Sequence, residues 1–111
     1  MTRFGLSQAT IDTINQIFKK YPAITKVIIY GSRAMGTYKN GSDIDLTIID
    51  YQLKDQDYTQ LFVDLDDLFI PYTFDLSLYR EIDNEDLKAH IQRVGQVFYE
   101  RDEYHSVKAD Q

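Results

Sequence analysis

The centre of the chain reads Ile28-Ile29-Tyr30-Gly31-Ser32-Arg33-Ala34-Met35-Gly36 and, after a short loop, Asp43-Ile44-Asp45-Leu46-Thr47-Ile48, and the rest of the fold is arranged around these two runs. The apolar, mostly β-branched run from Val27 to Tyr30 is typical of a strand buried on both faces. Gly31 allows the backbone to turn sharply after this strand, and Ser32 is suited to cap the short helix that follows. Because the N–H groups at a helix start are unpaired and carry partial positive charge, this turn is a natural seat for phosphate.

The second half of the stretch supplies negative charge. Side chains two apart on a strand share a face, so Asp43, Asp45 and Thr47 project to one side and the apolar residues between them to the other. Two neighbouring carboxylates repel each other unless a cation or a shared proton relieves them, and Mg²⁺ binds carboxylates together with substrate phosphates. A phosphate seat beside a pair of carboxylates predicts a site for a metal-bound nucleotide.

These residues resemble the signature of the polymerase-beta-like nucleotidyltransferases, in particular the minimal bacterial and archaeal ones. The resemblance rests on Gly31–Gly36, on Ser42-Asp43-Ile44-Asp45-Leu46, and on a third aspartate in Phe74-Asp75-Leu76. The closing Gly95–Glu100 segment is also similar to that family. Met35 departs from the pattern, because many members carry a basic residue there.

The expected fold class is α/β (α+β), a small mixed β-sheet with helices mainly on one face and a palm-like nucleotidyltransferase core. We expect one minimal domain over residues 1–111, with loose ends at 1–6 and 101–111.

Charge and composition narrow the classes of function. The chain has 18 acidic and 12 basic residues, a formal net charge of -6 and no cysteine. Scattered basic residues argue against an extended nucleic-acid groove, and the lack of cysteine excludes disulfides and thiolate chemistry. No signal-peptide pattern or membrane-length apolar run is present, so we expect a cytoplasmic protein without a membrane partner.

Periodicity predicts the remaining elements. A helix capped by Ser7 ends before Pro22, a second helix capped by Asp55 extends to Pro71, and a third begins at Asp83 or Asn84 and ends at Gly95. Strands are expected at 24–30, at 43–50, from Tyr72 to Tyr79, and at 97–99. The second helix shows the clearest apolar stripe, made by Tyr58, Leu61, Phe62, Leu65, Leu68 and Phe69.

Several polar residues have more than one interpretation. Asp64, Asp66 and Asp67 lie off the apolar stripe and are expected to form a solvated face. Arg33 could reach triphosphate oxygens or point to water. His90 and His105 have no partner cluster, and we assign neither to catalysis.

The resemblance implies transfer of a nucleotidyl group to an acceptor hydroxyl, with AMP from ATP as the expected group and another nucleoside triphosphate as the alternative donor. Asp43 and Asp45 would hold two Mg²⁺ ions, for which Mn²⁺ could substitute, and Asp75 would bind the ion nearest the acceptor and act as base. The nucleotide-binding set implied by the resemblance is Gly31, Ser32, Arg33 and Ser42.

The resemblance also implies a partner, a small HEPN-domain toxin that such enzymes neutralise, as antitoxins, by attaching AMP to a tyrosine. Tyr79, Phe98 and Tyr99 are candidates for the docking rim. Two alternatives remain open: an inactive nucleotide-binding module that acts by docking, and a nucleotidyltransferase for small molecules or RNA ends. The acceptor, the preferred base and a possible homo-oligomer are not determined by the sequence.

Overall fold

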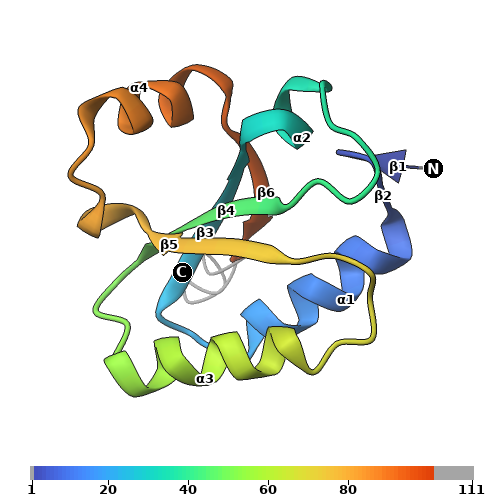
Figure 1. Ribbon diagram of the computed structural model, residues 1–111. Helices are drawn as coiled ribbons and strands as arrows, with labels where there is room; N and C mark the ends of the chain where they lie inside the picture. The colour runs from blue at the N-terminus through green and yellow to red at the C-terminus, as the bar shows by residue number, and fades with distance from the viewer. Residues whose placement is uncertain (1, 102–111) are drawn as a thin grey trace, which may run out of the picture.

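The computed structural model describes residues 2–101, which are built around a four-stranded mixed sheet (Figure 1). The strand order is β5-β4-β3-β6. The pairs β3–β4 and β3–β6 are antiparallel and β4–β5 is parallel, which confirms the predicted mixed sheet. The strand bounds are β3 Ile24–Tyr30, β4 Ile44–Asp50, β5 Phe74–Leu78 and β6 Gln96–Glu100.

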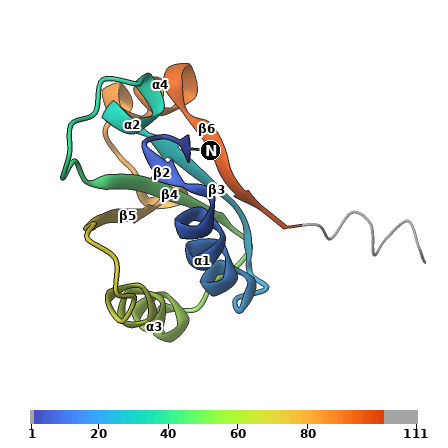
Figure 2. The same cartoon turned by 90° about the vertical axis from the view of Figure 1, so that its right-hand side faces the viewer.

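Helices lie on both sides of this sheet. The two longest, α1 (Gln8–Lys19) and α3 (Asp55–Asp66), cover one face. On the other side, α2 (Gly31–Met35) and α4 (Glu85–Val94) lie together (Figures 1 and 2), and a 3₁₀ turn at Tyr79–Glu81 leads from β5 toward α4. The expectation that helices are mainly on one face therefore holds for the two longest helices only.

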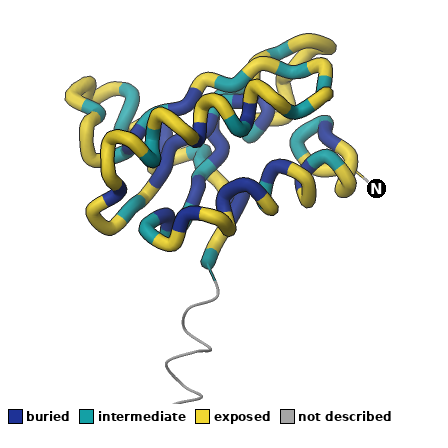
Figure 3. Tube along the Cα trace, turned by 90° about the horizontal axis from the view of Figure 1, so that it is seen from below, coloured by how far each residue is buried: buried dark blue, intermediate teal, exposed yellow. Residues whose placement is uncertain are grey.

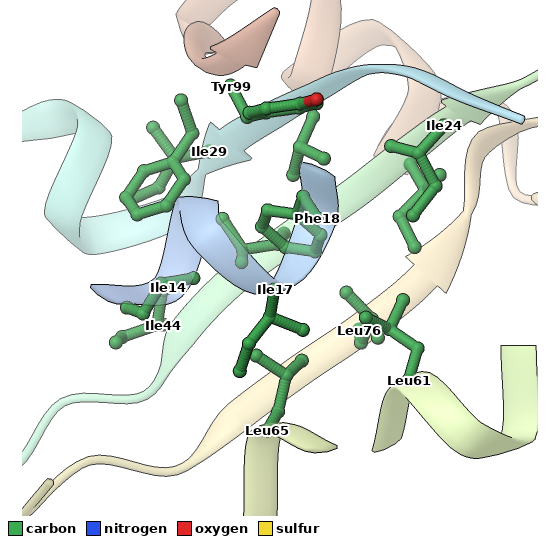
Figure 4. Close-up of a cluster of buried hydrophobic side chains, with 14 of the residues drawn as sticks. Ile14, Ile17, Phe18, Ile24, Ile29, Ile44, Leu61, Leu65, Leu76 and Tyr99 are labelled. Carbon is green, nitrogen blue, oxygen red and sulfur yellow. The ribbon is translucent and has the colours of Figure 1, made fainter. Parts of the chain in front are cut away.

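The hydrophobic core lies between the sheet and the two longest helices (Figure 4). Ile44, Leu46 and Ile48 of β4 are completely buried, as the alternation along this strand predicts. The helices contribute residues spaced three and four apart, so that one stripe of each faces the sheet. These helical core residues are Ile11, Ile14, Ile17 and Phe18 of α1 and Leu61 and Leu65 of α3.

The predicted caps hold at two of the helices. Ser7 accepts a hydrogen bond from Thr10 N at 3.1 Å at the start of α1, and Asn84 accepts one from Leu87 N at 3.0 Å at the start of α4. Helix α3 differs, because its N-cap is Lys54 and makes no side-chain capping bond, while Asp55 lies in the first turn.

The end of α3 corrects another expectation. The helix ends at Asp66 rather than at Pro71, and Phe69, predicted to continue the apolar stripe, is fully exposed. Strand β5 accordingly begins at Phe74 rather than at Tyr72. Apolar residues keep their helical spacing in the sequence after Asp66, although the backbone is no longer helical there. The spacing alone therefore predicts too long a helix.

The segment 1–6, expected to be loose, is ordered over its described residues. Strand β1 (Thr2–Arg3) pairs antiparallel with β2 (Leu6–Ser7), and Leu6 is completely buried in the core. The turn between them has positive φ at Phe4 and Gly5, at 60° and 73°. At the other end, the Arg101 guanidinium donates to the carbonyls of Ile24, Lys19 and Tyr21. The rest of the expected loose end, 102–111, lies outside the described residues.

Candidate functional site

The turn between β3 and α2 is shaped by a glycine that lies beneath a carboxylate. Gly31 has a φ of 72°, a conformation that favours glycine. A Cβ at this position would collide with Oδ2 of Asp45, which projects from the paired strand β4. The turn therefore lies directly against one of the predicted catalytic carboxylates.

Ser32 follows this glycine but does not have the predicted capping role. The N-cap of α2 is Tyr30, whose side chain makes no capping hydrogen bond, and Ser32 lies inside the helix. The helix ends after five residues at Gly36, where φ is 81°. The capping interpretation of Ser32 is therefore wrong, and a phosphate-binding role for its hydroxyl stays a prediction.

The three predicted aspartates lie at the same end of two neighbouring strands. In the parallel β4–β5 pair, Asp45 lies opposite Asp75, so both side chains project from the same face of the sheet. Asp43 precedes β4 and accepts a hydrogen bond from the Thr73 hydroxyl, while Ile44 N donates to the Thr73 carbonyl at 2.9 Å. The register of two distant segments thus places Asp43, Asp45 and Asp75 together.

Electrostatics show that these carboxylates interact. Burial raises the pKa of Asp45, and repulsion from Asp75 and then Asp43 raises it further, while His90 and Arg33 act in the opposite direction. Asp45 is half-buried, whereas Asp43 and Asp75 are exposed. The cluster is accordingly a concentration of negative charge that is open to a ligand from solvent.

This charge fits a divalent cation bound together with phosphate. A cation would relieve the repulsion that raises the pKa of Asp45. Within residues 2–101, no three carboxylate or histidine side chains converge into a ready-made metal site. Mg²⁺ is commonly held by one or two carboxylates with water and substrate phosphates, so this donor set suits an ion that arrives with a nucleotide.

Arg33 and Ser42, both predicted to contact nucleotide, are engaged in holding the loop that precedes β4. The Arg33 side chain is buried, and it donates from Nε and Nη2 to the Ser42 carbonyl at 3.2 and 2.9 Å and from Nη1 to the Phe4 carbonyl at 2.8 Å. The rings of Tyr38 and Tyr72 flank its guanidinium, with centroids 5.3 and 5.0 Å from Cζ.

Arg33 therefore does not point to water, which was one of the two positions expected for it, and its donors are engaged with backbone carbonyls. Ser42 accepts a hydrogen bond from Lys39 N at 2.9 Å through its hydroxyl, which closes the same loop. Both residues hold the loop that leads to Asp43, and their contact with nucleotide remains a prediction.

Sequence reasoning missed a group of side chains beside the carboxylates. Tyr30 is buried, and its pKa is raised first by burial and then by Asp75, with partial compensation from hydrogen bonding to Ser77. The His90 ring of α4 meets the Tyr30 ring edge-on, with centroids 6.2 Å apart. Strand alternation already placed Ser77 on the face of Asp75, but no local pattern indicated His90.

Met35, the departure from the family pattern, is half-exposed at the end of α2. It lines a shallow hollow of about 400 Å³ together with Arg3, Tyr38 and Gln96. Arg3, from the N-terminal hairpin, therefore brings a positive charge near Met35.

A family model for polymerase beta nucleotidyltransferases matches residues 12–104. No curated protein matches the chain. Among the described residues, no helix is both long and apolar enough to span a membrane.

Solved structures with the same fold include toxin–antitoxin complexes. One, a toxin–antitoxin with AMP-PNP, aligns with a TM-score of 0.66 at 18% identity, covering 87% of this chain and 78% of that one. A second is a tri-AMPylated Shewanella oneidensis HEPN toxin in complex with MNT antitoxin. It aligns with a TM-score of 0.61 at 16% identity, covering 90% of this chain and 77% of that one. The toxin–antitoxin MntA–HepT aligns with a TM-score of 0.56 at 16% identity, covering 91% of this chain and 79% of that one.

Proposed function

This chain belongs to the polymerase beta nucleotidyltransferase family, and on that premise we propose that it transfers AMP from ATP to a hydroxyl group of a partner protein. The observation that carries the proposal is the β4–β5 register, which pairs Asp45 with Asp75 beside the Gly31 turn. A phosphate seat next to clustered carboxylates is what nucleotidyl transfer requires, because the substrate brings both a triphosphate and a cation.

The reaction forms one bond to the α-phosphorus and breaks one, and the acceptor hydroxyl gives up its proton. The acceptor oxygen attacks the α-phosphorus, the bond from that phosphorus to the bridging oxygen breaks, and pyrophosphate leaves. Asp75, the exposed member of the pair, takes the proton of the acceptor hydroxyl. Gly31 and Ser32 hold the β- and γ-phosphates through backbone N–H and hydroxyl donors, which orients the α-phosphorus for in-line attack.

Asp43, Asp45 and Asp75 would hold Mg²⁺, with Mn²⁺ as a substitute. When bound, the metal supplies charge neutralisation for the triphosphate and for the departing pyrophosphate. Thr73 orients Asp43 through its hydroxyl, and the turn at Gly31 positions the Asp45 carboxylate. These contacts keep the two carboxylates from turning away from the nucleotide.

The proposed acceptor is a tyrosine hydroxyl of a HEPN-domain toxin, so that the chain acts as an antitoxin. Support comes from the fold shared with complexes of HEPN toxin and MNT antitoxin, one of them with an AMPylated toxin. The net charge of -6 also disfavours a polyanionic acceptor such as RNA.

Co-expression with a HEPN-domain protein encoded beside this chain, followed by intact-mass measurement of that partner, tests the proposal. We expect additions of whole AMP units to the partner that disappear with Asp45→Asn. Asp83→Asn, at an exposed carboxylate between the 3₁₀ turn and α4, is the matched control and should leave the additions unchanged.

The second candidate function is a docking module without transferase activity. Two observations favour it: position 35 carries an uncharged methionine, and the Arg33 guanidinium is engaged with backbone carbonyls. Fewer basic side chains are therefore available to bind phosphate at the turn of Gly31 and Ser32. A partner that binds but stays unmodified, without Mg²⁺-dependent release of pyrophosphate, would support this candidate instead.

A further inference from the structure

Helix α3 presents an apolar and acidic surface that the fold does not explain. Phe62 and Val63 of α3 are 39% and 46% exposed, and Phe69, just after the helix, is completely exposed. Asp66 and Asp67 lie one turn after Phe62 and Val63, so they share the same side of the helix. We call these residues the α3 outer surface: Phe62, Val63, Asp66, Asp67 and Phe69.

The exposure of Phe69 is fixed by its neighbours. Leu68 and Ile70 on either side of it pack against the hydrophobic core, and Pro71 restricts the backbone that follows. The chain is therefore anchored before and after Phe69 while its ring points outward. A fully exposed aromatic ring forgoes the stabilisation that burial would give it, and folding alone does not account for this exposure.

The acidic residues of this surface are also unexplained by folding. Asp66 and Asp67 lie at the C-terminal end of α3, where the helix dipole disfavours negative charge and no basic residue compensates it. Within residues 2–101, neither makes an ion pair. Between Lys54 and Arg80 the sequence has six aspartates and no basic residue, so the segment that contains α3 is strongly acidic.

Figure 3 views the molecule from the side of α1 and α3, and exposed residues recur along both helices. Figure 1 shows that the connection from α3 rises along one edge of the molecule to the start of β5, where Asp75 and Thr73 lie. The segment that follows α3 therefore leads to the strand that carries Asp75, whose side chain alternates with the core residue Leu76 and projects from the other face of the sheet. In contrast, Phe98 and Tyr99, expected as a docking rim, are buried in the core and do not form one.

We propose that the α3 outer surface docks a partner protein whose contact face is basic around an apolar pocket that receives Phe69. Exposed aromatic side chains in an acidic setting complement lysine and arginine around an apolar centre. A second copy of this chain would present the same negative charge and is disfavoured, as is nucleic acid. The surface deepens the proposed function and rests on it, since the partner is the protein that receives AMP.

Calorimetric titration of the full chain with the HEPN-domain partner, without nucleotide, tests this surface. Phe69→Ser removes the anchor and should weaken binding by about tenfold or more. Asp66→Lys combined with Asp67→Lys should weaken it too, and should also reduce the dependence of affinity on salt. Val97→Ser on β6, 41% exposed, and Asp83→Lys are the controls for apolar and charged changes away from α3.

Parent-like affinity in both α3 variants, an equal loss in the controls, or no binding by the parent would overturn the proposed surface. Self-association of the parent that Phe69→Ser abolishes would assign the surface to a second copy and would overturn it too. Because binding is measured without nucleotide, the two proposals fail separately. Binding through α3 without AMP transfer would count against the proposed function alone.

Discussion

At position 31, hydrogen is the only side chain that fits beneath the Asp45 carboxylate. Gly31→Ala adds a Cβ that collides with Asp45 and strains a residue whose φ is 72°. We expect the free energy of unfolding, measured in urea, to fall by about 2 kcal/mol and AMP transfer to be lost. Gly36→Ala is the control, because Gly36 also has positive φ but open space around it. It should lose only about 1 kcal/mol and retain transfer.

Burial and repulsion from Asp75 and Asp43 disfavour the ionised form of the Asp45 carboxylate. Asp45→Asn removes the repulsion from Asp75 and Asp43, so the protein without ligands should melt no lower than the parent. The same change removes a metal ligand, so Mg²⁺ with ATP should no longer raise the melting temperature. A variant that still responds to Mg²⁺ and ATP as the parent does would contradict the metal assignment.

The Ser32 hydroxyl does not cap α2, so its replacement should affect nucleotide binding more than folding. Since its side chain is not the cap of α2, Ser32→Ala should alter the free energy of unfolding by less than about 0.5 kcal/mol. Loss of a hydroxyl that donates to phosphate should weaken ATP binding about fivefold, measured by calorimetry. A large loss of stability would instead restore the capping role.

At the scale of elements, Arg33 joins α2 to the N-terminal hairpin and to the loop before β4. Arg33→Lys keeps the charge but leaves the carbonyls of Phe4 and Ser42 without their full set of donors. We expect a loss of about 2 kcal/mol in unfolding free energy and faster amide hydrogen exchange in residues 37–42. Arg93→Lys, at an exposed position of α4, should change neither, and unaltered exchange in the Arg33 variant would refute this role.

Asp64 connects the two helices that cover one face of the sheet, and so links distant parts of the molecule. It accepts hydrogen bonds from Tyr21, Gln60 and Lys20, and those from Tyr21 and then Gln60 lower its pKa most. Asp64, expected on a solvated face with Asp66 and Asp67, instead joins α3 to the end of α1.

The lowered pKa of Asp64 determines how its contribution to the free energy of unfolding changes with pH. The folded protein binds the Asp64 proton less readily than the unfolded chain, so the contribution is complete above the ordinary aspartate pKa and is lost as pH falls through the lowered value. Asp64→Asn should therefore be less stable than the parent by about 2 kcal/mol at neutral pH. This difference should shrink in acid, as measured by urea unfolding across pH. A constant difference would show that charge is not involved.

Local patterns in the sequence determined most of the elements. Strand alternation correctly placed Asp43 and Asp45 on the side of β4 away from Ile44, Leu46 and Ile48, because side-chain direction along a strand depends only on parity. Caps at Ser7 and Asn84 were also predictable, since a capping bond joins residues only three apart. The family resemblance supplied Asp75 as the third carboxylate.

Contacts between groups that are distant in the sequence became visible only in the folded chain. The pairing of Asp45 with Asp75 depends on the β4–β5 register, and the burial of Arg33 depends on Phe4, which is far away in sequence. The ordered hairpin at residues 2–7 and the outward Phe69 likewise follow from packing against the core. Periodicity describes one segment at a time, whereas these contacts are selected by the free energy of the assembled fold, in which burial and hydrogen bonding between segments outweigh local preference.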